Sequence, residues 1–504
     1  MKIILIRFLQ REGALSNIPW HYSFYKDILE SKGHVVDIVD NQVEKYSDDE
    51  LVEMVFSGEY GLVATGGIGS IYSSLKPFLV QLKKQVPDVK IVVGGQIVAD
   101  YEFVLRACPI DIVVLGEGEK TLLKIAEAFE KGQDWRQLPG IAYIDREGQI
   151  QKTAPETLLR LDDLPDLNFD NINIEKYNTE VSDRFLINES AAELFRKNYR
   201  FLHIFVARGC PYKCFFCYRH LPGYRTYSPA RLDKMLGDLK KRGFAFFHFS
   251  DECITADINH LKSICEIAKK NEVFWNSNGR VDHVSGELLH MLSTHNCASI
   301  AYGIESFDNS MLEAMYKKTT AQQNIDAINW SYQYGIYTVI QLVIGAPGEN
   351  RDTIFNTRKG VWLCYTDSDQ IACSILNPYP GSAAYYYGLE HGQITDREYV
   401  HFEFSDKTKL VVNFSDLSMR ELTAWQRWIV CEAALSYRIK NRKFLLNRNF
   451  LSKGKAFVKA YFLLLRKPLD FFQFSYYLFK GITYWSVPVK KIRWRELAGD
   501  QRNV

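Results

Sequence analysis

The segment ARGCPYKCFFCYRH places Cys210, Cys214 and Cys217 in a CxxxCxxC spacing. With ten cysteines in 504 residues, chance would produce such a triplet with a probability of about 0.004. The chain begins without an export signal, so its cysteines are expected to be thiols or metal ligands rather than disulfides. Two kinds of metal site fit the spacing. His220 could complete a closed, structural Cys3His zinc site, or three thiolates could hold a 4Fe-4S cluster whose fourth iron stays open to an exchangeable ligand.

The elements that must position these cysteines form a repeating pattern. Between Leu202 and Leu376, six strand-like segments alternate with segments that can hold a helix. They read HIFVARG, FAFFHFSD, VFWNSNGR, SIAYGIES, YTVIQLVIG and QIACSIL. Six βα units predict a partial (β/α) TIM barrel, a fold whose active sites lie at the carboxyl ends of its strands. The cysteines follow the first of these strands, so we expect them at that end.

A second alternation of strands and helices fills the first 130 residues. Short β-branched segments such as KIILIRF, GLVATGG and VKIVVGG predict a parallel, doubly wound sheet of the α/β class. Such sheets bind ligands outside the carboxyl ends of their strands, where glycines let a ligand approach the backbone. The same glycines would also suit plain strand-to-helix turns. The residues at these ends are Thr65, Gly66, Gly67, Gly94, Gly95, Gly116, Glu117, Gly118 and Glu119.

These patterns divide the chain into four expected domains. A Rossmann-like, flavodoxin-like domain spans 1–137, and a hairpin with a Pro/Asp-rich linker spans 138–195. The partial barrel spans 196–388. From 389 to 504 the chain becomes helical, basic and aromatic. Residues 437–504 hold 16 Lys and Arg against three acidic residues, so the overall net charge of +2 conceals a net charge of −11 over the first 436 residues.

The motifs together resemble the radical S-adenosylmethionine (radical SAM) superfamily, specifically its cobalamin-binding subgroup of class B methyltransferases. The resemblance covers roughly residues 1 to 390. It is carried by CxxxCxxC with Phe216 before the last cysteine, by the VVGG and LGEGE strand ends, by the PGIAYIDREG hairpin, and by HFSDECIT, NSNGRVD, YGIESFD, VIGAPGEN and NPYPGSAAY after successive barrel strands.

The resemblance implies a 4Fe-4S cluster on Cys210, Cys214 and Cys217, with S-adenosylmethionine on its open iron. The acidic pair after the second strand would accept hydrogen bonds from the ammonium or ribose of that molecule, and an arginine would fork onto its carboxylate. Each such residue alone would more often form a surface ion pair, but six matching strand ends favour a binding site. The implied contacts with S-adenosylmethionine are Phe216, Asp251, Glu252, Arg280, Glu305, Gly345, Pro347 and Gly348.

The resemblance further implies that cobalamin binds at the glycine-rich strand ends of the first domain. One motif is missing, because residues 1–150 contain only His21 and His34 and neither lies in a DxHxxG sequence that would supply a cobalt ligand. The sequence therefore does not identify the lower ligand of cobalt. Among the remaining cysteines, Cys253 follows the acidic pair and could face the site, whereas the others suit a protein core.

The basic, aromatic tail fits three interpretations. It could be a helical cap on the barrel, a peripheral contact with the inner face of an anionic membrane, or an RNA-binding segment, although no RNA-binding motif is visible. The amino terminus turns charged before a secretory segment is complete, and no apolar run is long enough to span a membrane. A cytoplasmic protein is therefore expected.

The activity implied by the resemblance is methylation of an unactivated carbon of a small-molecule or lipid-like substrate, through a 5′-deoxyadenosyl radical and methylcobalamin. An external electron donor of the flavodoxin or ferredoxin type would be required. Two alternatives stay open: a radical SAM oxidative cyclase or rearrangement enzyme that does not methylate, and a cobalamin-sensing protein without turnover. The intact cysteine triplet argues against the second.

Overall fold

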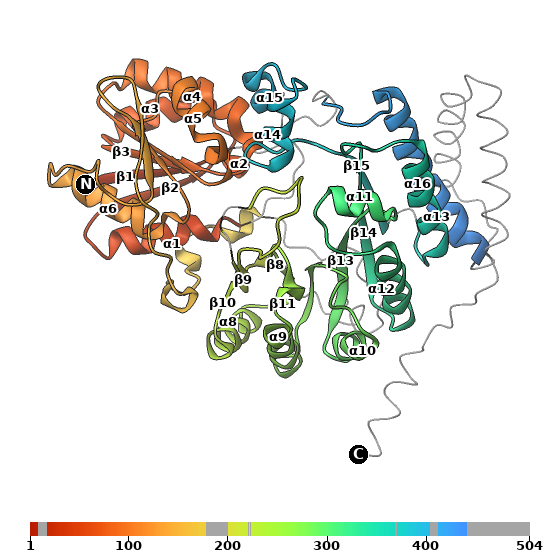
Figure 1. Ribbon diagram of the computed structural model, residues 1–504. Coiled ribbons are helices and arrows are strands. Elements are labelled where there is room, and N and C mark those ends of the chain that lie inside the picture. Colours follow the sequence, from red (N-terminus) through yellow and green to blue (C-terminus); the bar gives the residue numbers. More distant parts are fainter. Residues whose placement is uncertain are drawn as a thin grey trace. The chain divides into compact units, whose positions relative to one another are not determined.

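A computed structural model describes residues 1–8, 18–177, 200–219, 221, 223–367, 370–403 and 412–440 of the chain (Figure 1). The chain divides into two compact units. The first comprises Met1–Thr179, Phe216–Ser228 and Pro378–Val411, and the second comprises Glu180–Phe215, Pro229–Asn377 and Val412–Val504. The chain passes from the second unit to the first between the second and third cysteines of the triplet.

The first unit is built on a seven-stranded sheet of order β2-β1-β3-β4-β5-β6-β7. Strands β1 to β5 are parallel, and β6 and β7 form an antiparallel hairpin that pairs with β5. The order reverses beside β1, so the switch point at which such sheets bind ligands lies between β1 and β3. The strands are β1 (Lys2–Arg7), β2 (Val35–Asp40), β3 (Leu62–Gly66), β4 (Lys90–Gly94), β5 (Ile112–Val114), β6 (Ile141–Ile144) and β7 (Ile150–Lys152).

Helices cover both faces of this sheet. Successive side chains of its central strands point to opposite faces, and those on both faces are apolar. Ile4 and Ile6 of β1 pack with α3 (Asp48–Ser57), α4 (Tyr72–Gln85) and α5 (Tyr101–Ala107). Ile3 and Leu5 of the same strand pack with α1 (Trp20–Glu30) and α6 (Gly118–Glu130) on the opposite face. The doubly wound α/β sheet expected from the sequence is therefore confirmed. Its remaining helices are α2 (Asn41–Glu44), α14 (Ala383–Glu390) and α15 (Arg397–Glu403).

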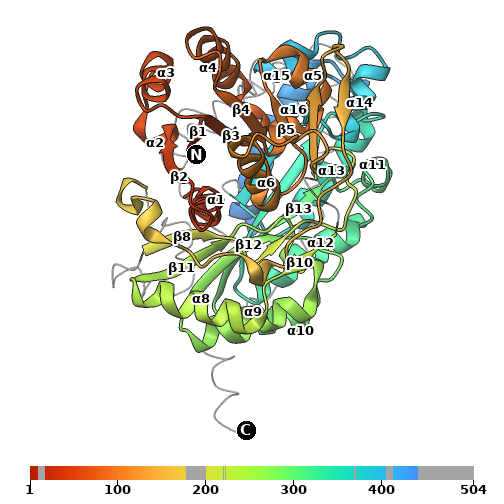
Figure 2. The same cartoon turned by 90° about the vertical axis from the view of Figure 1, so that its left-hand side faces the viewer.

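The second unit is built on a six-stranded sheet of order β15-β14-β13-β12-β11-β8, in which all neighbours are parallel. Helices alternate with the strands and cover one side of the sheet, as α8, α9 and α10 show in Figure 2. This is the partial barrel that the sequence predicts. Its strands are β8 (Arg200–Ile204), β11 (Phe244–Phe249), β12 (Phe274–Gly279), β13 (Cys297–Glu305), β14 (Tyr337–Ile344) and β15 (Ile371–Ile375).

The helices of the second unit start at residues that can cap them. Asp257, Ser285, Thr320 and Asn350 each accept a backbone N–H hydrogen bond at the start of a helix, which satisfies donors that have no partner within the helix. The helices are α8 (Pro229–Lys241), α9 (Ile258–Lys270), α10 (Gly286–Thr294), α11 (Asn309–Ala314), α12 (Ala321–Gln333), α13 (Arg351–Leu363) and α16 (Met419–Lys440).

A buried ion pair holds α16 against α13. Arg358 donates to Glu432 through two nitrogens, and both side chains are at most 4% exposed. Such a forked pair fixes both position and orientation. The rest of the expected basic tail, residues 441–504, lies outside the described residues.

Candidate functional site

The cysteine loop starts at the carboxyl end of β8, and a carboxylate anchors its first residues. Asp251, just after β11, accepts hydrogen bonds at Oδ1 from the backbone nitrogens of Val206 and Ala207, both at 3.0 Å. Its Oδ2 is buried without a hydrogen-bond partner. Burial raises the pKa of this carboxyl to about 7. Asp251 thus ties the end of the second barrel strand to the loop that carries the cysteines.

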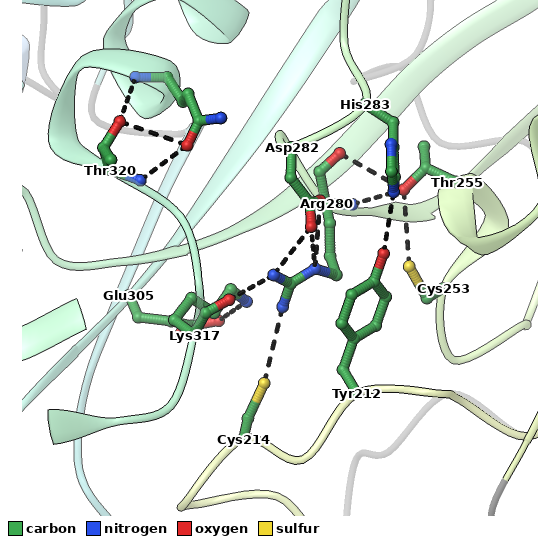
Figure 3. Close-up of polar contacts among 11 residues, drawn as sticks. Tyr212, Cys214, Cys253, Thr255, Arg280, Asp282, His283, Glu305, Lys317 and Thr320 are labelled. Atoms are coloured by element: carbon green, nitrogen blue, oxygen red, sulfur yellow. Dashed lines mark hydrogen bonds and ion pairs between the residues drawn. The ribbon is translucent and has the colours of Figure 1, made fainter. Parts of the chain in front are cut away.

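Arg280, directly after β12, forms the centre of the polar network in Figure 3. Its side chain is buried, and its Nε and Nη2 donate to Asp282 at 3.1–3.2 Å. Its Nη1 points at the sulfur of Cys214, 3.7 Å away. The guanidinium also lies 3.8 Å from the ring centroid of Tyr212. The guanidinium thus brings a positive charge next to the sulfur of Cys214.

Glu305 ends β13 and is paired with a lysine from the following loop. Its Oε1 accepts a hydrogen bond from Lys317 Nζ at 2.7 Å, and both side chains are about 95% buried. Gly303 makes room for the pair, since a Cβ there would lie 2.6 Å from both charged atoms. Glu305 also has a φ of 61°, a left-handed conformation that non-glycine residues adopt only where the surroundings hold it.

The loop that carries Lys317 also connects the cysteine loop with Arg280. The backbone oxygen of Met315 accepts a hydrogen bond from the nitrogen of Phe215, at 2.9 Å, and the backbone oxygen of Lys317 accepts one from Arg280. Tyr316 and Lys318 both have a positive φ. This loop therefore supports three of the expected site elements at once, at the cost of local backbone strain.

The turn after β14 is closed by a buried carboxylate. Glu349 is 1% exposed and accepts a hydrogen bond from the backbone nitrogen of Gly345, and burial raises its pKa to about 7. Gly345 and Gly348 have φ values of 90° and 82°, conformations that favour glycine. An added Cβ at Gly348 would meet nothing within 4 Å. The backbone beside Pro347 is thus open on the Gly348 side.

The other expected contacts differ in exposure. Glu252 is exposed, Phe216 is half-buried, and Cys253 is buried with its sulfur 3.5 Å from the hydroxyl of Thr255. That hydroxyl accepts a hydrogen bond from the backbone nitrogen of Arg280, at 2.9 Å. Cys253 therefore lies next to the residue that fixes the Arg280 backbone.

The strand-end glycines of the first unit pack closely against one another. A Cβ at Gly66 would lie 2.4 Å from the backbone oxygen of Gly94, and a Cβ at Gly95 would lie 2.8 Å from the nitrogen of Gly67. Thr65 is buried beside the hydroxyl of Tyr22. Glycine is required at these positions because two strand ends approach each other, whether or not a ligand also approaches them.

The last of these strand ends, after β5, contains both charged and apolar contacts. Glu117 forms an ion pair with Arg225, Glu119 is buried, and a Cβ at Gly118 would lie 3.0 Å from the hydroxyl of Tyr25. Gly116 has a φ of 96° and faces the side chain of Leu221. Within the first unit, segment 216–228 thus lies against this strand end.

Of the two histidines near the amino terminus, His34 lies away from the carboxyl edge of the sheet and His21 lies on the protein surface. His34 is buried at the amino end of β2, where its Nδ1 lies 3.2 Å from the terminal nitrogen of Met1. His21 is exposed on α1, with its ring tilted against that of Tyr22 and the centroids 4.6 Å apart. His34 is therefore at the wrong end of the sheet to bind a ligand at the strand ends.

Two domain families match the chain. Residues 204–359 match the Radical SAM superfamily, and residues 23–126 match the B12 binding domain. The chain therefore carries a radical SAM domain and a B12-binding domain. The radical SAM match includes all three cysteines and the carboxyl ends of every barrel strand except β15, and the B12-binding match includes β2 to β5.

Relatives cover most of the chain at low identity. An uncharacterized methyltransferase, PH0819, of Pyrococcus horikoshii is 23% identical over 84% of this chain and 90% of its own length. An anaerobic magnesium-protoporphyrin IX monomethyl ester cyclase of Cereibacter sphaeroides is 26% identical over 84% of this chain and 68% of its own length. The cobalamin-dependent S-adenosylmethionine radical enzyme OxsB, solved with aqua-cobalamin and S-adenosylmethionine, superposes with a TM-score of 0.64, covers 95% of this chain and 75% of its own, and is 17% identical.

Three cysteine thiols are the kind of donor set that a 4Fe-4S cluster with one open iron requires. Cys210, Cys214 and Cys217 are all free of disulfides. Within the described ranges, no three His, Cys, Asp or Glu side chains converge on a point that could hold one metal ion. A cluster does not require such convergence, because each thiolate binds a different iron. His220, the fourth ligand of the zinc alternative, lies outside the described residues.

The B12-binding domain also has a buried polar atom without a hydrogen-bond partner near one of its strand ends. The hydroxyl oxygen of Ser70, four residues after β3, is buried without a hydrogen-bond partner. A buried hydroxyl of this kind is a candidate for a ligand hydrogen bond. The residues at the switch point therefore fit a polar cofactor such as cobalamin, which B12-binding domains hold.

Three residues of the radical SAM site were missed by sequence reasoning. Asp282 orients Arg280, Lys317 neutralises Glu305, and Tyr212 lies under the guanidinium. The sequence offers a signal only for the first, because Asp282 follows Arg280 by two residues in NGRVD. Lys317 reaches Glu305 from a loop whose path the sequence does not fix.

Proposed function

We propose that this protein is a cobalamin-dependent radical SAM enzyme that methylates an unactivated carbon of a small-molecule or lipid-like substrate. The observation that carries the proposal is the presence of a B12-binding domain and a radical SAM domain in one chain. The similarity to a methyltransferase over 90% of that relative's length favours methyl transfer.

A second candidate is a radical SAM reaction without methylation, as in an oxidative cyclase or rearrangement enzyme. The 26% identity to an anaerobic cyclase favours it. Both candidates use the same cysteines and strand ends, so they differ in the fate of the substrate rather than in the site.

When bound, the cluster, S-adenosylmethionine and cobalamin supply radical chemistry and a transferable methyl group. The chain's own residues would hold these groups in place. Cys210, Cys214 and Cys217 would bind the cluster. Besides its expected contact with the carboxylate of S-adenosylmethionine, Arg280 would hold the second thiolate through Nη1, and Asp282 would fix the guanidinium in that orientation.

The remaining strand ends would hold S-adenosylmethionine. Asp251, whose buried Oδ2 has no hydrogen-bond partner, would accept a hydrogen bond from the ammonium. Glu305, which accepts a hydrogen bond from Lys317, would accept another from a ribose hydroxyl. The open backbone beside Pro347, between Gly345 and Gly348, would lie against the adenine, with Phe216 packing nearby, and Glu252 would contribute from the exposed side.

The domain limits are part of the proposal. The B12-binding domain would span 1–137, the hairpin and linker 138–195, the radical SAM barrel 196–388 and the C-terminal region 389–504. Cobalamin would contact Thr65, Gly67, Gly95, Gly116 and neighbouring residues at the strand ends. An external flavodoxin or ferredoxin would supply the electron.

Cytoplasmic location and peripheral contact of the basic tail with a membrane are further parts of the proposal. In the part of the chain that the structure describes, every helix is too short or too polar to span a lipid bilayer. The basic residues of 437–504 support the membrane contact, since each contributes about 1 kcal/mol near an anionic surface.

Labelled methionine tests the proposed reaction. Cells that express the chain would be grown anaerobically with methyl-deuterated methionine, beside cells that express Cys214→Ser and cells that express Cys431→Ala as a matched control. We expect a metabolite that carries one fully deuterated methyl group with the wild type and with Cys431→Ala, and none with Cys214→Ser. A product that depends on Cys214 but carries no deuterium would instead establish the cyclase candidate.

A further inference from the structure

The third cysteine of the triplet belongs to the first unit. Cys217 lies in segment 216–228, which is part of the same compact unit as the B12-binding sheet. We call residues 216–228 the Cys217 segment; residues 220 and 222 of it lie outside the described residues. Cys217 itself is exposed. Its position therefore depends largely on how the residues around it are anchored.

Two contacts anchor the Cys217 segment to the end of β5. A Cβ at Gly116 would lie 3.5 Å from Cδ2 of Leu221, so this side chain lies against the backbone of the strand end. Arg225 donates a hydrogen bond through Nη2 to Glu117, and the two side chains are 25% and 9% exposed. A partly buried ion pair of this kind is screened less by salt than a surface pair.

Arg225 also connects the Cys217 segment to the linker of the first unit. Its Nη1 donates to the backbone oxygen of Leu159 at 2.6 Å, and the backbone nitrogen of Ser228 donates to Oδ1 of Asp162 at 2.9 Å. The guanidinium thus uses two nitrogens on two separate pieces of chain. Because the fork of an arginine is rigid, these contacts fix its orientation as well as its position.

A glycine brings the Cys217 segment against the end of β4. Gly381 has a φ of 84°, and a Cβ there would lie 2.6 Å from Cβ of Ala99 and 3.0 Å from the ring of Tyr218. Ala99 lies in the short helix η2 (Gln96–Asp100), which follows β4, and Tyr218 follows Cys217 in the sequence. Gly381 is therefore packed between a strand end of the sheet and the neighbour of the third cysteine.

A buried carboxylate holds η2 and the chain around Gly381 together. Asp100 is 3% exposed and accepts hydrogen bonds from the hydroxyl of Tyr385 at 2.6 Å and from Nη2 of Arg397 at 2.9 Å. Its Oδ2 also lies 3.3 Å from Nε2 of His401. These three partners belong to α14 and α15. The packing around Gly381 is thus a fixed part of the first unit.

The anchors connect Cys217 to the strand ends at which cobalamin is proposed to bind. Strands β4 and β5 are neighbours in the sheet, and the proposed cobalamin contacts include Gly95 and Gly116. A ligand at these ends restricts the backbone to which the Cys217 segment is attached. A metal centre on Cys217 restricts the same segment from its other side. Whichever binds first removes freedom that the second would otherwise have to remove, so each binding event favours the other.

We propose that the Cys217 segment couples the two cofactors, so that binding of cobalamin at the ends of β4 and β5 and binding of the cluster to Cys217 strengthen each other. Arg225 is the positioning residue of this coupling, since it holds the segment to Glu117. The inference rests on the proposed function, which requires both cofactors in one chain. Coupling between two binding events is reciprocal, so either event can be measured.

Binding of methylcobalamin to the full chain, with and without its cluster, tests the coupling. The protein would be kept anaerobic and dark, iron and sulfide would be counted in each sample, and bound cobalt would be measured after equilibrium dialysis. We expect the cluster-loaded chain to bind methylcobalamin at least about fivefold more tightly than the cluster-free chain, which is the lower end of typical coupling between sites.

Variants assign the coupling to Arg225. Arg225→Met should reduce the ratio of the two affinities to within about twofold, because methionine makes neither hydrogen bond. Arg225→Lys retains the charge and should retain part of the ratio. Lys124→Met is the matched control, since Lys124 forms an ion pair in the same unit with Glu156, whose side chain is 10% exposed; its ratio should equal that of the wild type. A folding defect weakens binding in both forms and leaves their ratio unchanged.

Hydrogen exchange gives a second measurement that needs no cluster. Methylcobalamin should slow the exchange of backbone amides in residues 216–228 of the cluster-free wild type, because binding holds the strand ends to which they are anchored. It should not do so in Arg225→Met. The amides of α10 (Gly286–Thr294) should exchange at the same rate with and without methylcobalamin in both proteins.

Equal affinities of the two forms, weaker binding to the cluster-loaded form, a ratio that survives in Arg225→Met, or unchanged exchange in residues 216–228 would each overturn the inference. Formation of 5′-deoxyadenosine would be measured on the same preparations. If it forms while the two affinities are equal, the inference fails and the proposed function stands. If the coupling is present and no 5′-deoxyadenosine forms, the proposed function fails instead. If neither form binds methylcobalamin, both fail.

Discussion

Replacement of Lys317 by methionine tests how the Glu305 carboxylate is held in the site. Lys317 Nζ lies 2.7 Å from Glu305 Oε1, and the two side chains are 5% and 6% exposed. A Cβ at the neighbouring Gly303 would lie 2.6 Å from both atoms. Lys317→Met would leave Glu305 buried without its counter-charge. Removal of one partner of such a pair costs about 3–5 kcal/mol, whereas replacement of both partners by neutral groups costs far less. We therefore expect the double variant Glu305→Gln/Lys317→Met to be more stable than Lys317→Met.

The free energies of unfolding come from urea titrations of four apoproteins: the wild type, the two single variants and the double variant. Binding of S-adenosylmethionine would be measured on the reconstituted proteins by calorimetry. We expect weakened binding in both single variants, because the proposed ribose contact needs a charged and oriented carboxylate. A cost below about 1 kcal/mol for Lys317→Met, or single costs that simply add in the double variant, would refute the view that the pair is buried and coupled.

Three further changes have expected outcomes. Asp251→Asn should flatten the pH dependence of apoprotein stability. Because the pKa of Asp251 is raised in the folded protein, the free energy of unfolding of the wild type falls as pH rises from about 4 to 7, by up to roughly 1.4 kcal/mol per pH unit. Urea midpoints across this pH range measure the change. Gly66→Ala should destabilise the protein by about 1–3 kcal/mol and Gly94→Ala much less, since only the first Cβ would meet backbone within 2.4 Å; thermal unfolding compares the two. Arg280→Gln should lower the reduction potential of the cluster, because a positive charge beside a thiolate favours the reduced form; a redox titration followed by EPR measures it, with the exposed Arg242→Gln unchanged.

The fold was largely predictable because its signals are local. Strands such as FAFFHF and KIILIR are short and rich in apolar β-formers, and the helices between them start at capping side chains. The alternation of these elements fixes a parallel sheet in each unit. Antiparallel pairing of the β6–β7 hairpin also followed from a turn centred on Asp145 to Gly148.

The contacts of the site were less predictable, because they depend on how loops fold back. The sequence places Arg280 at a strand end, but it does not show that Asp282 engages two of its nitrogens and leaves Nη1 for Cys214. It also does not show that Lys317 pairs with Glu305. Gly66 was read as a place where a ligand could approach, and the structure shows that the backbone of Gly94 approaches it.

The neighbouring rings of His203 and His248, 4.9 Å apart, were hidden for a different reason. His203 and His248 lie in strands that read as apolar, 45 positions apart, and only the register of parallel strands brings them together. Register depends on packing across the whole sheet. A residue-by-residue search for motifs therefore passes over such a pair.

The proposed radical chemistry can be measured on the anaerobically reconstituted chain with S-adenosylmethionine and a low-potential reductant. We expect about four irons and four sulfides per chain, bound cobalamin, and 5′-deoxyadenosine that is absent with Cys214→Ser. Zinc in place of iron and sulfide, or an intact cluster that never cleaves S-adenosylmethionine, would contradict it.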